Sequence, residues 1–270
     1  MNKNIYNILI TSRPTTSIIT FFTVFIMLMQ DNSFLLSFNG GLIFLFITAY
    51  GFIINDIMDY KKDTVAKRKR PIAQNKLSRK FAMYFSIILV ASLLIFEYFL
   101  RGYNLSFYIV LSTILLLTIY SFISLYIPIL KGFITGILCI TPILYVSTII
   151  QIDFHYAIYF IILLYIFGRE LYMDAQDYEG DILSNLKTIP YYIGVIQSKY
   201  IGLSIMLLAS IILLIYNFYI YNPLLFLLSL LAFSVMLFSI FISFKDEDKA
   251  ISLTKISMLL AIIPLFAIAT

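Results

Sequence analysis

Charged residues, cysteine, histidine and tryptophan are all scarce in this sequence of 270 residues. Only 12% of the residues are charged, about half the share in a typical soluble domain. The single cysteine, Cys139, excludes an intrachain disulfide. With one histidine, His155, the chain has no zinc-ligand spacing and no Ser-His-Asp arrangement, and it carries neither a Walker loop nor a dinucleotide fingerprint. These absences exclude an ordinary soluble domain and indicate none of the common nucleotide or zinc enzymes.

Apolar residues fill most of the chain instead. They make up 61% of the sequence, the mean hydropathy is +0.97, and long Ile, Leu, Phe and Tyr segments recur throughout. A membrane-spanning helix needs about 20 such residues. We therefore predict an all-α integral membrane protein, with about nine transmembrane helices in a single bundle and one polytopic domain over residues 1–270. The predicted helices are centred near Phe21, Phe44, Leu89, Ile114, Leu138, Leu163, Leu208, Leu230 and Leu260.

Basic residues are distributed unevenly between the predicted connections. Nine of the nineteen Lys and Arg residues fall between Lys61 and Lys80, and if the N-terminus is cytoplasmic the opposite side carries only Arg101. This positive-inside pattern places the N-terminus and two long polar segments, about 55–80 and 174–199, in the cytoplasm. We expect the protein in the cell inner membrane, in contact with its lipids. The net charge of +5 then reflects topology and phosphate binding, not nucleic acid.

Two aspartate clusters interrupt the apolar pattern, and acids near a bilayer are costly and usually functional. Their spacing of i, i+3 and i+7 allows each trio to share one helical face. Two facing carboxylate trios would form an oxygen-only cage, which suits Mg²⁺ better than a soft metal and leaves coordination sites for substrate phosphates. The pattern predicts a site for a phosphorylated substrate at the membrane surface. The trios are Asp56, Asp59, Asp63 and Asp174, Asp177, Asp181.

Each cluster is followed by a distinct trailing motif. Asn55-Asp56-x-x-Asp59-x-x-x-Asp63 precedes Arg70-Pro71-Ile72, and Asp174-x-x-Asp177-x-x-Gly180-Asp181 precedes Lys187-Thr188-Ile189-Pro190. These motifs resemble the two signatures of the UbiA superfamily of intramembrane prenyltransferases, and the likeness extends over the whole chain. Arg169-Glu170 is similar to the branch that makes archaeal-type ether lipids and chlorophyll. Thr16 and Ala73-Gln74-Asn75 depart from the usual pattern, which leaves the acceptor open.

The resemblance implies a Mg²⁺-dependent prenyltransferase that moves an isoprenoid chain from a polyprenyl diphosphate to an aromatic, quinone-precursor or glycerol-lipid acceptor. It implies two Mg²⁺ ions, which neutralise the departing diphosphate together with Lys and Arg. Asn55, Asp59 and Asp63 are assigned to one ion and Asp174, Asp177 and Asp181 to the other, with Asp56 as a ligand or an orienting group. The catalytic aspartates are Asp59, Asp63, Asp177 and Asp181. Diphosphate is assigned to Lys67, Arg68, Arg70, Lys131 and Lys187. The acceptor or the allylic cation is assigned to Tyr126, Glu170 and Tyr172.

Three alternatives stay open at the level of sequence. The acids could be helix-end charges paired with neighbouring bases, and the run from Lys67 to Arg70 could only attract anionic lipid, at about 1 kcal/mol per charge. A membrane terpene cyclase would use the same metals but the substrate's own alkene as the acceptor. An ion-coupled transporter would place acids near the bilayer midplane on Gly- or Pro-broken helices, whereas this chain has ten Gly and its acids lie at predicted helix ends.

Overall fold

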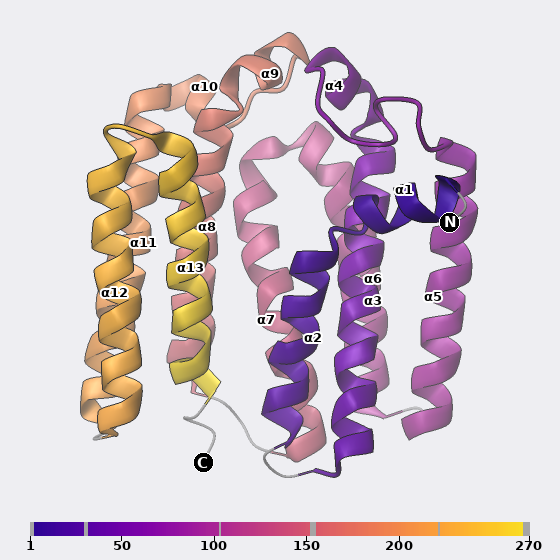
Figure 1. Ribbon diagram of the computed structural model, residues 1–270, viewed down its shortest axis with the longest axis horizontal. Helices are drawn as coiled ribbons and strands as arrows, with labels where there is room; N and C mark the ends of the chain where they lie inside the picture. The colour runs from indigo at the N-terminus through magenta and orange to yellow at the C-terminus, as the bar shows by residue number, and fades with distance from the viewer. Residues whose placement is uncertain (1–2, 30–31, 103, 152–154, 221, 267–270) are drawn as a thin grey trace. The chain divides into compact units, whose positions relative to one another are not determined.

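The computed structural model describes residues 3–29, 32–102, 104–151, 155–220 and 222–266 (Figure 1). These residues form helices and their connections, and no strand occurs among them. Each of the nine predicted segment centres lies in a helix, so the predicted all-α fold class is confirmed. The chain forms two compact units. Unit 1 comprises Met1–Pro128, Thr141–Gln151 and Glu179–Leu186, and unit 2 comprises Ile129–Ile140, Ile152–Tyr178 and Lys187–Thr270.

The number of membrane spans is close to the predicted nine. Seven helices in the described ranges are long and apolar enough to cross a membrane. The helices α1 (Lys3–Thr11) and α2 (Pro14–Met29) are bent by 59° at their break and would add an eighth span if they act as one. The ninth predicted centre, Leu260, lies in α13 (Glu247–Phe266), which carries four charged residues in its first half and is not among these spans. The count of nine is thus approximate.

Unit 1 is built around α3 (Phe34–Met58), which packs against α1, α2, α5 (Arg79–Arg101) and α6 (Leu105–Tyr126). In Figure 1, α1 lies across the direction of α2 and α3. Local sequence sets the helix starts, because Ser33 and Asn104 accept hydrogen bonds from the first-turn N–H groups of α3 and α6. The other helices with residues in unit 1 are α4 (Tyr60–Val65), the second half of α7 (Lys131–Ile150) and most of α9 (Tyr178–Leu183).

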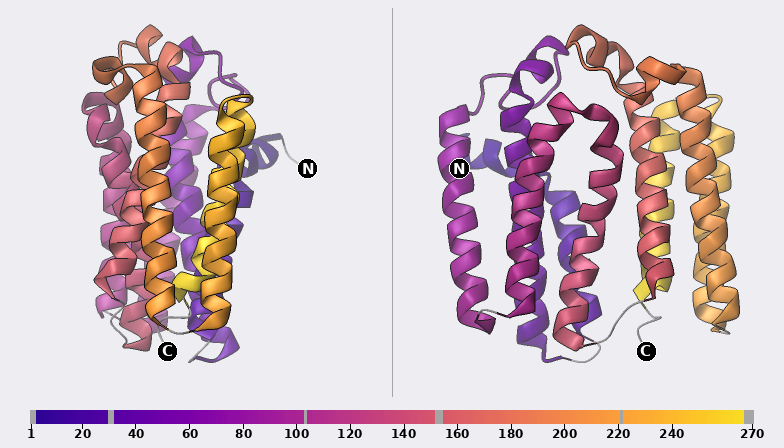
Figure 2. Two further views of the ribbon diagram at one scale, coloured as in Figure 1. Left: turned by 90° about the vertical axis from the view of Figure 1, so that its left-hand side faces the viewer. Right: turned by 180° about the vertical axis from the view of Figure 1, so that it is seen from behind.

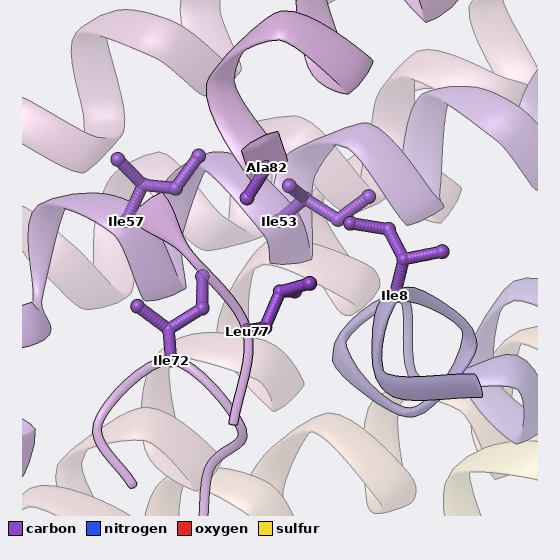
Figure 3. Close-up of a cluster of buried hydrophobic side chains, with 6 residues drawn as sticks. All are labelled: Ile8, Ile53, Ile57, Ile72, Leu77 and Ala82. Carbon is purple, nitrogen blue, oxygen red and sulfur yellow. The ribbon is translucent and has the colours of Figure 1, made fainter. Parts of the chain in front are cut away.

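One apolar cluster in unit 1 fixes the polar connection that follows α4. Figure 3 shows side chains from α1, from α3, from the connection and from the start of α5 meeting in this cluster. All are at most 5% exposed, so the connection is anchored by burial as well as by its backbone hydrogen bonds. This anchoring positions the basic residues that precede it. The cluster consists of Ile8, Ile53, Ile57, Ile72, Leu77 and Ala82.

A second feature of unit 1 is a buried set of polar groups around Glu97 on α5. Glu97 is fully buried, and its carboxylate accepts hydrogen bonds from Arg101 at 2.8 Å, Ser106 at 2.8 Å and Tyr145 at 3.3 Å. Arg101 also donates to the Tyr145 hydroxyl at 2.6 Å. Both carboxylate oxygens therefore have partners, as a buried charge requires.

In unit 2, α8 packs against α11, and α12 packs against α13 and α11; Figures 1 and 2 show these helices side by side. Two glycines allow α8 and α11 to approach closely. A Cβ atom on Gly202 would lie 2.6 Å from the carbonyl oxygen of Gly168, and one on Gly168 would lie 2.7 Å from that of Gly202. Small residues at such contacts are typical of membrane helix pairs. The helices are α8 (Tyr156–Gln176), α10 (Ile189–Ile193), α11 (Val195–Tyr219), α12 (Pro223–Ser243) and α13, with the first half of α7.

Candidate active site

The first acid cluster lies where α3 passes into α4. Asp59 donates its backbone N–H to the carbonyl oxygen of Asn55 at 2.8 Å, and Asp63 donates to that of Asp59 at 2.9 Å. The helical turn therefore continues through the junction. The side-chain amide of Asn55 also donates to Asp59 Oδ2 at 3.0 Å. Asp56 lies on the same side as Asp59 and Asp63, as their spacing predicts, because all three approach Arg70.

Arg70 lies among the three carboxylates of this cluster. Its Nη1 is 2.7 Å from Asp56 Oδ1, 2.9 Å from Asp63 Oδ2 and 3.9 Å from Asp59 Oδ2. Arg13 adds a second cation, 3.9 Å from Asp56 Oδ1. Asp56 and Asp63 are almost fully buried, so these contacts have little competition from solvent.

Asp63 has an oxygen that is not fully used. Its Oδ1 is buried and accepts no hydrogen bond from the described residues, and the nearby Arg68 Nε lies 3.6 Å away. Burial raises the pKa of Asp63 to about 6, although the positive charge of Arg70 acts in the opposite direction. A buried carboxylate oxygen of this kind is suited to coordinate a cation.

The turn after α4 determines which bases face the acids. Lys67 adopts a left-handed backbone conformation, with φ of 51°, and the N–H of Arg68 returns to the carbonyl oxygen of Asp63 at 2.9 Å. This turn directs Arg68 and Arg70 toward the carboxylates and leaves Lys67 exposed. Of the basic residues predicted here for diphosphate, the structure brings two to the acids and leaves the third at the surface.

Part of the second acid cluster lies in unit 2, at the end of α8. Lys131, the first residue of α7, has its ammonium 2.6 Å from Asp174 Oδ1 and 3.3 Å from Glu170 Oε2. Glu170 and Asp174 are one turn apart and both are buried. Gly132 permits this contact between helices, because a Cβ there would lie 3.3 Å from the Cβ of Glu170. Asp177 follows directly after Gln176, as the C-cap residue of α8.

The last acid of that cluster, Asp181, belongs to unit 1. It is buried on α9, with Oδ1 2.6 Å from the ammonium of Lys62. A Cβ on Gly180 would lie 3.3 Å from the Cβ of Ala66, so glycine allows α9 to approach the turn after α4. Sequence reasoning missed Lys62. Its place within the first acid cluster is the feature of the sequence that could have indicated it, and Lys61 shares that place.

The other predicted residues lie in different surroundings. Lys187 is exposed, with its ammonium 5.1 Å from the centre of the Tyr191 ring. Tyr126 is 80% exposed at the end of α6. Tyr172 is buried in the core of unit 2 with Leu203 and Met206. The exposed ammonium of Lys187 is accessible to a ligand, whereas the ring of Tyr172 packs in the apolar core.

The donor set suits a hard cation. As they stand, no three His, Cys, Asp or Glu side chains in the described ranges form a group that could hold a metal ion, since Arg70 lies among the first trio and Lys131 is paired with Asp174. The groups are nevertheless almost all carboxylate oxygens, and Asp63 keeps a buried oxygen without a hydrogen-bond donor. Oxygen ligands of this type are those that Mg²⁺ prefers. The residues therefore fit Mg²⁺ by their chemistry.

Apolar spanning helices with acids at their ends, each followed by bases, define a polytopic membrane enzyme that handles a phosphorylated substrate. The UbiA prenyltransferase family matches residues 16–263, and the chain belongs to this family. It is an integral membrane prenyltransferase, as the sequence motifs predict.

Several archaeal proteins are similar over most of their length. Digeranylgeranylglyceryl phosphate synthase of Methanosphaera stadtmanae is 24% identical over 91% of this chain and 90% of its own. The same enzyme of Methanothermobacter thermautotrophicus is 28% identical over 88% of this chain and 85% of its own. Among solved structures, a UbiA homologue from Archaeoglobus fulgidus bound to GPP and Mg²⁺ has a TM-score of 0.73 at 17% identity, covering 97% of this chain and 99% of that one.

Proposed function

We propose that this enzyme transfers a prenyl chain from a prenyl diphosphate to the hydroxyl of a glycerol phosphate lipid. The relatives named above support this acceptor, because both are digeranylgeranylglyceryl phosphate synthases and match most of this chain. A product with two geranylgeranyl chains on glyceryl phosphate implies an acceptor that already carries one chain. The donor would then be geranylgeranyl diphosphate.

The acid clusters are the proposed Mg²⁺ ligands. Asn55, Asp59 and Asp63 would hold one ion, with Asp56 as a further ligand or an orienting group. Asp174, Asp177 and Asp181 would hold the other. Support comes from the oxygen-only donor set and from the Mg²⁺ and GPP bound to the A. fulgidus homologue. When bound, Mg²⁺ neutralises the charge that develops on the departing diphosphate.

The basic residues that now contact the acids would bind the diphosphate itself. Arg68 and Arg70 lie on the turn beside Asp63, and Lys131 lies beside Asp174. Arginine can hold phosphate oxygens through two parallel N–H donors, whereas lysine acts as a point charge. Their positive charge favours the leaving group as it becomes a free anion, which lowers the barrier to breaking the allylic bond. Lys67 and Lys187 would contribute from exposed positions.

In the proposed reaction, the allylic C–O bond to diphosphate breaks and diphosphate leaves with the electron pair. A bond forms between that carbon and the acceptor hydroxyl oxygen, whose proton is released to water. A terpene cyclase would break the same bond but would close the carbon chain on its own alkene. The acceptor requirement separates the two reactions. The positive-inside pattern supports a cytoplasmic N-terminus and active site. The membrane would be the cell inner membrane.

The proposal is tested with purified protein in detergent, geranylgeranyl diphosphate and Mg²⁺. Diphosphate release is measured and lipid products are identified by mass spectrometry, with aromatic acids, quinone precursors and a singly prenylated glyceryl phosphate added in turn. We expect release that requires Mg²⁺ and rises only with the glyceryl phosphate. A cyclic hydrocarbon formed without any acceptor would favour the cyclase, and a product with an aromatic acceptor would replace the glycerol lipid.

A further inference from the structure

Arg169 is a positively charged residue inside a membrane-spanning helix, and it has no anionic partner among the residues that the structure describes. It lies on α8, seven residues before the last residue of that helix, Gln176. This places its Cα atom about 10 Å along the axis from the helix end. It forms no ion pair with any residue in the described ranges. Its Nη1 donates to the sulfur of Met173 at 3.0 Å, and its Nε is buried without a hydrogen-bond partner. Thioether sulfur is a weak acceptor, so these two nitrogens of the partly buried guanidinium are poorly satisfied.

The nearby acids are directed elsewhere. Glu170 is the next residue on α8, about 100° around the helix, and its carboxylate contacts Lys131. Glu170 and Asp174 both contact Lys131. The cation that neutralises these two acids is therefore Lys131, although Arg169 is adjacent to Glu170 in sequence.

The hydroxyl of Tyr165 does not supply a partner either. Tyr165, one turn deeper on α8, donates its hydroxyl to the carbonyl oxygen of Thr254 at 2.7 Å. An arginine near a helix end can extend its head group to the interface, which leaves the whole guanidinium in water. The buried Nε of Arg169 does not match that arrangement. An uncompensated cation in such surroundings is costly, and in membrane helices it usually marks a ligand site.

The position along α8 favours the acceptor over the donor as the source of the anion. Asp174 lies about 7.5 Å closer than Arg169 to the acid-rich end of the helix, where the diphosphate is proposed to bind. An acceptor hydroxyl must reach the allylic carbon next to that diphosphate. In a glycerol phosphate lipid the phosphate is only a few bonds from the hydroxyl. A cation one to two turns below the diphosphate site could therefore hold the acceptor phosphate without holding the leaving group.

We propose that Arg169 binds the phosphate of the acceptor lipid and thereby selects a phosphorylated acceptor. This inference rests on the proposed prenyltransferase reaction. It assigns Arg169 to acceptor recognition, separate from Arg68, Arg70 and Lys131, which serve the diphosphate.

The test compares two acceptors: singly prenylated glyceryl phosphate and the same lipid without its phosphate. In the Arg169→Met variant, kcat/KM for the phosphorylated acceptor should fall about 10- to 100-fold, because a charged hydrogen-bonded contact is lost. The value for the alcohol and the KM for geranylgeranyl diphosphate should not change. Arg169→Lys should recover part of the preference. Arg79→Met, which removes a guanidinium from the exposed start of α5, should behave as wild type.

An equal loss with both acceptors, or a higher KM for the donor, would overturn the assignment. Binding of the phosphorylated lipid is also measured without donor, as the rise in Tm that the lipid produces. This rise should occur in the wild type and be absent in Arg169→Met. If the wild type binds the lipid through Arg169 but releases no diphosphate, the proposed reaction fails and the binding site stands. If turnover occurs while the rise in Tm persists in Arg169→Met, the binding site fails alone.

Discussion

The ammonium of Lys131 lies 2.6 Å from Asp174 Oδ1, at the start of α7 and near the end of α8. This pair joins a proposed diphosphate ligand to a proposed metal ligand. Glu170 holds the same ammonium from 3.3 Å. When Asp174 binds a cation, Glu170 remains as the carboxylate that orients Lys131.

Replacing Lys131 tests this arrangement. Lys131→Met should raise the KM for the prenyl diphosphate about 10- to 100-fold, because one charged contact to the substrate is lost. Glu170→Gln should raise it less, since the lysine is retained but is held by one acid fewer. Steady-state kinetics in detergent measure both. Lys199→Met is a matched control, because Lys199 also has a carboxylate at 2.6 Å, that of Glu247. A similar KM change in the control would assign the effect to lost ion pairing in general.

Arg70 should stabilise the protein when metal is absent. Arg70→Met leaves three carboxylates close together, two of them buried, and breaking such a set costs about 3–5 kcal/mol. We expect a lower Tm in EDTA and a larger rise in Tm on adding Mg²⁺ than in the wild type. Thermal unfolding in detergent measures this difference. The exposed neighbour variant Lys69→Met should show neither effect. If the Tm of Arg70→Met did not respond to Mg²⁺, the trio would not be a metal site.

The aspartates themselves should be needed for turnover but not for folding. Asp63→Asn and Asp181→Asn should each lower kcat by more than about 100-fold, since even residues that only support metal ligands cost about 10- to 100-fold. The helical circular dichroism spectrum and the elution volume should stay as in the wild type. Asp248→Asn, at an exposed acid of α13, is the matched control. Wild-type rates in either cluster variant would remove these residues from the site.

The close contact of α8 with α11 makes a separate prediction about stability. In Gly202→Ala the new methyl group would meet the Gly168 carbonyl at 2.6 Å, so the helices must separate, at a cost of about 1–3 kcal/mol. Gly136→Ala is a milder change, because its Cβ would lie 3.4 Å from Leu163. Chemical or thermal unfolding of both variants measures the difference. Equal stability of the two would mean that the glycine contact does not limit helix approach.

Much of the fold and the acid clusters could be predicted from sequence because both depend on local patterns. Apolar runs of about 20 residues indicate spanning helices, and the i, i+3, i+7 spacing places Asp56 beside Asp63 without knowledge of the fold. The side to which a base turns is not a local property. Lys67 and Arg70 are both assigned to diphosphate from the sequence, yet the left-handed turn at Lys67 leaves it exposed and directs Arg70 to the acids.

Contacts between distant segments could not be predicted from the sequence either, because they too depend on the fold and not on local patterns. The pairing of Lys62 with Asp181 joins residues 119 positions apart, and nothing in either motif selects Lys62 over Lys61. The partners of Lys131 could not be predicted either, because only the packing of α7 on α8 brings this lysine to Glu170 and Asp174. Arg169 stands beside Glu170 in the sequence, and only the structure shows that Glu170 contacts Lys131 instead.

The buried pair of Glu97 and Arg101 bears on how the chain enters the membrane during synthesis. The two residues are one helical turn apart, so their contact can form as soon as α5 is helical, before later segments leave the ribosome. Ser106 follows within the next helix, whereas Tyr145 is 48 residues beyond Glu97 and arrives later. Two charges can therefore enter the lipid already neutralised, as one hairpin, and the later tyrosine secures a hairpin that is already inserted.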